Sequence, residues 1–283
     1  LSHTSTTTIQ GFGASATLSV DTYLPLVSAG VGNVTEANRQ ITWRTAATLS
    51  RLRGYVSVNT GSAAATVSTR LNALAGAQSF SVTAGGTGEF EDTTNSDSVA
   101  VADEANLFYD QTAGTSMAFS GMIHCESAGV LRLGMISGLG FNSLVYTGIN
   151  ATNDTNATES NVQLKARVAA DFKNLYLYIS ANTRDAATTY GLREEGVTTI
   201  SVSPGASGIG VFEETSTTST SVTTDHLNYI LDASPGTTGL VTAQVISIEQ
   251  QPAAGVTTLP PGLDGSMAEW YERMSGTAVW MRY

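Results

Sequence analysis

The chain has 283 residues, and its 24 acidic and 13 basic side chains give a formal net charge of −11. A negative field repels phosphate, so this balance argues against nucleic acids and anionic membranes as partners. The single cysteine, Cys125, excludes an internal disulfide, and no Cys/His spacing indicates a zinc site. No apolar run reaches the roughly 18 residues that a membrane-spanning helix needs. Charged residues make up only 13%, while Thr, Ser, Ala, Gly and Val are abundant, which is typical of strands and turns.

The first long motif of the chain occurs twice. Residues 35–60 recur as residues 158–183 at a constant offset of 158 − 35 = 123, with identities that include Glu36 and Glu159. Phe80-Ser81-Val82 then matches Ile200-Ser201-Val202 at an offset of 120, and Asp103 matches Asp225 at 122.

A period near 122 is the length of a whole domain and exceeds the roughly 20 to 50 residues of a solenoid or propeller repeat. The sequence therefore predicts two tandem copies of one domain. We place the first copy at residues 1–127, with an N-terminal arm over 1–20, and the second at 128–250.

Alternation inside the repeat predicts a strand with one buried face. Leu175, Leu177, Ile179 and Ala181 point one way and Tyr176 and Tyr178 the other, and subtracting 123 gives Leu52, Gly54, Val56 and Val58 against Arg53 and Tyr55. Further strands are separated by turns, such as the Gly-rich segments 85–88 and 205–208, at spacings of about 8 to 12 residues. We therefore expect an all-β protein of two antiparallel β-sandwich or jelly-roll-like domains.

The last segment, 251–283, differs in composition. Pro and Gly form a linker, Ser266 to Glu269 fits a helix capping box, and 277–283 fits a strand, so we expect a short helix-strand tail. The tail either folds back on the second domain or anchors a partner, because Trp and Arg often carry binding energy. The residues proposed as the anchor are Trp270, Tyr271, Met274, Trp280, Arg282 and Tyr283.

Three motifs carry a family resemblance: Tyr23-Leu24-Pro25-Leu26, the Thr-Glu-Ala-Asn-x-Gln run at 35–40, and Phe-Glu-Asp-Thr-Thr at 90–94 followed by Ser-Val-x-Val-x-Asp at 98–103. Together they resemble β-sandwich domains in virion proteins of tailed phages, over residues 20–125 and 143–250. The resemblance implies a non-enzymatic structural protein, most directly a capsid decoration or cement protein on the outer surface of the virion. Its partners would be capsid or other virion proteins. A homotrimer would cover the exposed edge strands of the sandwiches.

The residues themselves offer little for catalysis, and we expect no enzyme, no cofactor and no metal. His124 and Cys125 are neighbours on a predicted strand, so their side chains point to opposite faces and cannot form a nucleophile pair. Asp103 reads as an aspartate that closes a turn, although Asp92, Asp97 and Asp103 together could also supply oxygens to calcium.

An alternative function comes from Tyr55 and Tyr178, which are equivalent at the offset of 123. Exposed together with Tyr176, they would form a stacking surface for carbohydrate, as in a tail-fibre or adhesin module that binds host glycans.

Overall fold

The computed structural model describes residues 7–252 except 15–17, 28, 31, 112–116, 127–130, 137, 139, 150–154 and 167–168. The described chain is all-β and mostly antiparallel, and its helical backbone is confined to two 3-10 turns, η1 (Glu36–Asn38) and η2 (Glu159–Asn161). The predicted helix-strand tail lies outside the described residues. Contacts divide the chain into two units on either side of residue 129, and the short segment Ala37–Ile41 belongs to the second unit.

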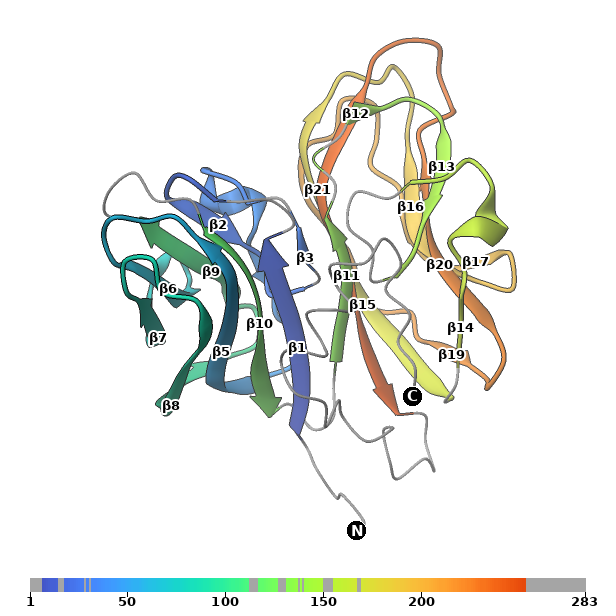
Figure 1. Cartoon of the computed structure of the whole chain (residues 1–283). Helices are drawn as coiled ribbons and strands as arrows, with labels where there is room; N and C mark the ends of the chain where they lie inside the picture. Colours follow the sequence, from blue (N-terminus) through green and yellow to red (C-terminus); the bar gives the residue numbers. More distant parts are fainter. Residues whose placement is uncertain are drawn as a thin grey trace. The chain divides into compact units, whose positions relative to one another are not determined.

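Two sheets form the first unit (Figure 1). One has the order β3-β1-β10-β5-β8, and the other has the order β2-β9-β6-β7 with β4 beside β9. The strands are β1 (Thr7–Ala14), β2 (Thr22–Leu24), β3 (Ala29–Gly30), β4 (Ile41–Thr42), β5 (Ala47–Asn59), β6 (Ala65–Leu71), β7 (Leu74–Val82), β8 (Gly88–Val99), β9 (Glu104–Gln111) and β10 (Met117–Glu126). Alternate residues of both sheets, such as Leu52, Val67 and Tyr109, enclose one core, which makes the unit a β-sandwich.

The second unit repeats the order of the main strands, but among the described residues β3 has no counterpart and two strands, β18 and β19, take the place of β8. One sheet has the order β11-β21-β15-β18 with β12 beside β21 and β19 beside β15, and the other has the order β13-β20-β16-β17 with β14 beside β20. The strands are β11 (Leu131–Ile136), β12 (Gly140–Phe141), β13 (Leu144–Thr147), β14 (Leu164–Lys165), β15 (Ala170–Asn182), β16 (Thr189–Glu194), β17 (Val197–Val202), β18 (Gly210–Glu214), β19 (Ser219–Ser221), β20 (His226–Asp232) and β21 (Val241–Pro252). Its core has the same character, with Phe172, Tyr190 and Tyr229 fully buried.

The predicted alternation is confirmed along most of β5 and β15 but fails near their ends. Leu52, Val56, Leu175 and Ile179 are buried as expected. Val58 and Ala181 are exposed instead of buried. The reason is a register shift next to each of them, at Ala118/Phe119 on β10 and at Ile179/Ala181 on β15, and an extra residue moves the following side chains to the other face.

Turn residues that the two copies share hold equivalent loops. Asp103 Oδ2 accepts a hydrogen bond from Ala100 N at 2.7 Å and Asp225 Oδ2 accepts one from Val222 N at 2.7 Å, so the predicted turn-closing aspartates are confirmed. Asn59 Nδ2 donates to Gly86 O and Asn182 Nδ2 donates to Gly208 O, which fixes both Gly-rich turns. Among the described residues, no helix is long and apolar enough to cross a membrane.

Candidate functional site

An arginine latch joins Glu36, the first residue of η1, to the hairpin between β6 and β7 in the first unit. Arg70 Nε donates to Glu36 Oε1 at 2.5 Å and its Nη2 donates to Glu36 Oε2 at 3.1 Å, so the pair is bidentate. Nη2 also donates to the carbonyl of Ala73 in the hairpin turn. The guanidinium carbon lies 5.6 Å from the ring centroids of both Tyr23 and Phe108. Pairing with Glu36 raises the pKa of the Arg70 guanidinium.

The second unit has the same latch, displaced by 123 residues: 36 + 123 = 159, 70 + 123 = 193 and 23 + 123 = 146. Arg193 Nε donates to Glu159 at 2.6 Å, Nη2 donates to the other Glu159 oxygen at 3.2 Å, and its guanidinium lies 5.5 Å from the Tyr146 ring. The sequence repeat includes Glu36 and Glu159 but not their arginine partners. The shared offset of 123 between Arg70 and Arg193 was the available signal.

Asp92 in β8 is buried in a ring of donors. Its Oδ1 accepts from Thr94 N at 3.0 Å and Asn95 N at 3.1 Å, and its Oδ2 accepts from Ser79 N and Asn95 Nδ2, both at 2.9 Å. Burial alone would raise the pKa of Asp92, but the hydrogen bonds from Asn95, Ser79 and Thr94 outweigh it and lower the pKa well below its ordinary value.

Asp97, five residues further along β8, supplies acceptors to a bulge in β7. Register runs from Arg70↔Ala75 to Ser68↔Ser79, so residues 76–78 of β7 bulge out of the ladder. Asp97 accepts from Ala77 N at 2.6 Å, from Gln78 Nε2 at 3.2 Å and from Thr69 Oγ1 at 2.5 Å. Gln78 Oε1 in turn accepts from Leu52 N at 3.0 Å.

These contacts give both aspartates a structural role. Their oxygens already face donors from the chain, and a calcium ion would have to compete with those donors. Within the described part of the chain, no group of three or more His, Cys, Asp or Glu side chains is arranged to hold a metal ion.

The tyrosines of the proposed stacking surface are divided between the two units. Tyr55 on β5 belongs to the first unit and Tyr178 on β15 to the second, and each is half-buried. Tyr176 was expected to be exposed, but only 2% of it is. Its hydroxyl donates to the backbone carbonyl of Gln40 at 3.1 Å, within the second unit. The tail-anchor residues Trp270, Tyr271, Met274, Trp280, Arg282 and Tyr283 lie outside the described residues.

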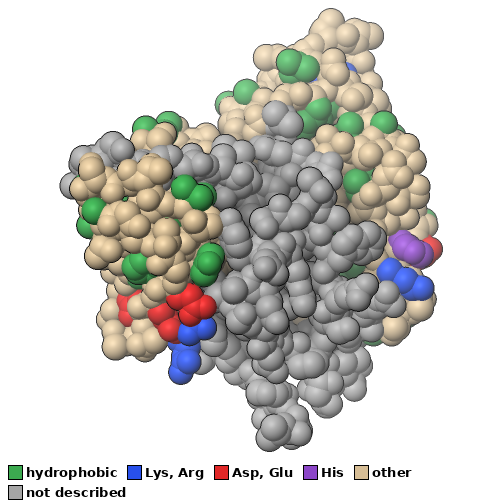
Figure 2. Space-filling view, viewed as in Figure 1, with side chains coloured by type: hydrophobic (Ala, Val, Ile, Leu, Met, Phe, Trp, Pro, Cys, Tyr) green, Lys and Arg blue, Asp and Glu red, His purple; other side chains and the backbone are tan. Residues whose placement is uncertain are grey.

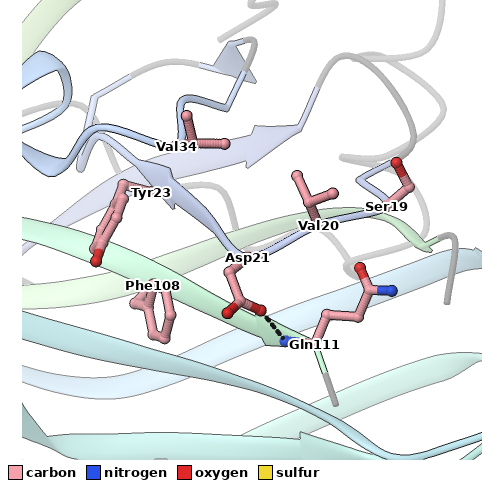
Figure 3. A pocket seen from close by; sticks show the side chains of 7 residues that line it. All are labelled: Ser19, Val20, Asp21, Tyr23, Val34, Phe108 and Gln111. Atoms are coloured by element: carbon pink, nitrogen blue, oxygen red, sulfur yellow. Dashed lines mark hydrogen bonds between the residues drawn. The ribbon is translucent and has the colours of Figure 1, made fainter. Parts of the chain in front are cut away.

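A shallow groove of about 540 Å³ lies beside the latch of the first unit (Figure 3). Tyr23 and Phe108 form one end, with ring centroids 4.8 Å apart, and Gln111 lies at the other end. Asp21 lies between them and accepts from Gln111 N at 2.8 Å. Sequence reasoning did not single out this groove, because β2 and β9 come together only in the folded sheet.

The exposed hydrophobic side chains do not gather into one patch on the face shown in Figure 2, where they are scattered among polar atoms. Single exposed apolar residues are normal on a protein surface and need no partner. The groove of the first unit, in contrast, brings aromatic, carboxylate and amide side chains together in one place, and we take it as the candidate site.

Comparisons with known proteins give little guidance. No protein-family model matches the sequence, and no curated protein matches it either. Among solved structures, the chain is similar to PNGF-II in space group C2 with a TM-score of 0.30 and 6% identity, over 90% of this chain and 66% of that one. PNGF-II in space group P21 gives a TM-score of 0.24 and 6% identity, over 86% of this chain and 66% of that one. The chain thus spans just under two thirds of these structures, and a likeness this weak carries no argument about function.

Proposed function

We propose that this chain is a non-enzymatic structural protein of a phage-like virion, most directly a decoration protein on the outer surface of the capsid. The observation that carries the proposal is the arginine latch, which both units keep with an equivalent glutamate and an equivalent tyrosine. The buried carboxylates Asp92 and Asp97 likewise hold strands and a bulge in shape. Charged groups used in this way favour a rigid scaffold. The placement of this scaffold on a virion rests on the resemblance of the sequence motifs to virion β-sandwiches.

The test is to purify virions from the host that carries the gene and to label them with an antibody raised against this chain. We expect immunogold label on the outside of intact capsids and a fixed copy number per particle by mass spectrometry. Chain found only in the soluble lysate would contradict the proposal.

Recombinant protein added to undecorated capsids tests the proposed anchor. A chain that lacks residues 262–283 should stay folded by circular dichroism but no longer sediment with capsids, while the full chain should sediment. Equal sedimentation of both would remove the anchor role from the tail. Cross-linking of the full chain should give trimers if the expected oligomer forms.

A further inference from the structure

The groove of the first unit has an aromatic end that the strand register fixes. Tyr23 on β2 and Phe108 on β9 are directly paired, and their rings are tilted by 33°. Arg70 lies over both rings but is not part of the groove lining. Because Glu36 and the Ala73 carbonyl hold Arg70, the aromatic pair rests on a fixed support.

The other end of the groove presents oxygens. Asp21 Oδ1 accepts one hydrogen bond from Gln111 N, and a carboxylate can accept several more. Gln111 also lines the groove, and its side-chain oxygen is buried without a hydrogen-bond partner, so a ligand reaches this oxygen only when the Gln111 side chain turns toward the groove. An unpartnered buried amide oxygen costs stability unless a ligand or water donates to it.

Apolar side chains complete the rim. Val20 is 54% exposed and Val34 is 68% exposed, and both line the groove. Val34 is placed there because the neighbouring Asn33 exchanges two backbone hydrogen bonds with Tyr23, at 2.8 and 3.0 Å.

The second unit keeps the frame of this corner and the tyrosine, Tyr146, but lacks the aspartate, the phenylalanine and the glutamine. Register pairs Tyr146 with Ile230, as Tyr23 is paired with Phe108. The positions of Asp21, Phe108 and Gln111 are occupied by Leu144, Ile230 and Ala233 in the second unit (21 + 123, 108 + 122 and 111 + 122).

In the second unit a backbone carbonyl takes the place of the Asp21 side chain as the acceptor at this corner. Ala233 N donates to the carbonyl of Ser143 at 3.3 Å, whereas Gln111 N donates to the Asp21 side chain. The second unit therefore forms this corner with other residues at the positions of Asp21, Phe108 and Gln111, so the shared topology alone does not account for these three side chains in the first unit.

We propose that the Asp21–Gln111 groove of the first unit binds one sugar ring of a neutral glycan. A pyranose has an apolar C–H face that packs on aromatic rings, and its hydroxyls donate to carboxylate and amide oxygens. The groove volume of about 540 Å³ is in the range of small-ligand sites.

The charges select against other ligands. Asp21 and the net charge of −11 repel uronic, sialylated and phosphorylated ligands. Arg70 already lies over both rings, so it weakens their attraction for a second cation such as a quaternary ammonium. This inference does not depend on where the protein resides, and it places the carbohydrate on different residues from Tyr55 and Tyr178.

The test uses the full chain on an array of neutral hexose and N-acetylhexosamine oligosaccharides, with sialylated glycans and choline as charged probes. Calorimetry then measures affinity for the strongest ligand. We expect binding to one or more neutral glycans and none to the charged probes. No neutral ligand on the array, or tighter binding of choline, would overturn the proposal.

The variants Asp21→Leu, Phe108→Ile and Gln111→Ala install the residues of the second unit on the same frame and should fold. Asp21→Leu and Phe108→Ile should each weaken binding at least tenfold and Gln111→Ala severalfold, with thermal melting checked for each. Asp21→Asn provides a variant of matched size. The control Tyr178→Ala should bind as the parent does. Unchanged affinity in both Asp21→Leu and Phe108→Ile, or loss of binding in Tyr178→Ala alone, would refute the site.

Discussion

The bulge of β7 in the first unit is wider than the corresponding bulge of β17 in the second. In the first unit the register passes from Ala75 to Ser79, which leaves three residues between them. The equivalent pairs of the second unit are Arg193↔Thr198 and Gly191↔Ser201, which leaves two residues, Thr199 and Ile200, and Ile200 is itself paired with Leu192. Gly76 lies in the wider bulge, where an added Cβ would come within 2.3 Å of Thr69 Oγ1 and 2.9 Å of Asp97 Oδ1.

The facing strand differs correspondingly. Asp97 pairs with Leu49, and its counterpart Ser219 pairs with the equivalent Phe172. Asp92 and Glu214 also correspond, because they pair with Leu52 and Leu175. In the first unit β8 runs unbroken from Gly88 to Val99, whereas the second unit divides it into β18 and β19. We infer that a wider bulge frees backbone N–H groups and that a buried carboxylate on the next strand compensates for them.

The largest expected effect is that of Asp97→Ala. The substitution leaves the part-buried Ala77 N–H and the buried Gln78 side-chain amide without the Asp97 acceptor, and the Thr69 hydroxyl keeps only its 3.3 Å contact with the Gln78 carbonyl. We expect a loss of about 3 kcal/mol in the unfolding free energy of the first unit. Hydrogen exchange followed by mass spectrometry reports on each unit separately, and β6, β7 and β8 should lose protection.

The matched control is Ser219→Ala, which changes the corresponding position of the second unit. It should cost no more than about 1 kcal/mol there, because the narrower bulge frees fewer groups. Equal losses from both substitutions would contradict the link between bulge width and the buried carboxylate.

Sequence reasoning predicts the fold class and the duplication but not these bulges. Hydrophobic alternation identifies β5 and β15 because their buried faces keep a period of two over several residues. The sequence match of Phe80 with Ile200 is wrong, because the two residues do not hold equivalent positions in the strand register. Phe80 pairs with Val67, and the equivalent of Val67, Tyr190, pairs with Val202. A one-residue difference inside a bulge leaves no signal in composition or period.

The groove escapes sequence reasoning for a different reason. Asp21 and Gln111 are 90 residues apart and meet only because β2 pairs with β9. Only a structural alignment of the two copies shows that Leu144 and Ala233 stand where the first copy has Asp21 and Gln111. Before that, Asp21 is one acidic residue among 24.

An intermediate effect should appear at low pH through Asp92. Its pKa in the folded protein is lowered from the ordinary 3.8, so its stabilisation is complete above about pH 5 and is lost as the pH falls through the folded pKa. Asp92→Asn places an amide opposite the donors Ser79 N and Asn95 Nδ2, and should cost about 2 kcal/mol at pH 7. The difference between parent and variant in urea midpoint should narrow from pH 7 to pH 3. A constant difference would show that the Asp92 charge does not stabilise the first unit.

The smallest expected effect comes from the latches, which test what the two units share. Arg70→Met and Arg193→Met keep an unbranched apolar stem but remove a half-buried bidentate ion pair in each unit. Each should cost its own unit about 1 kcal/mol. Adding Glu36→Gln to Arg70→Met should cost little more, because the partner is already lost.

Arg70 lies over two rings and Arg193 over one. The loss of unfolding free energy should therefore be larger for Arg70→Met than for Arg193→Met, by about 0.5 kcal/mol. Hydrogen exchange at the β6–β7 hairpin measures the effect of Arg70→Met, and exchange at the β16–β17 hairpin measures the effect of Arg193→Met. If Phe108→Ile reduces the effect of Arg70→Met to that of Arg193→Met, the second ring accounts for the difference between the units. If the difference persists, it arises from the bulge beside the latch, since residues 76–78 follow directly on the hairpin turn that Arg70 holds through Ala73.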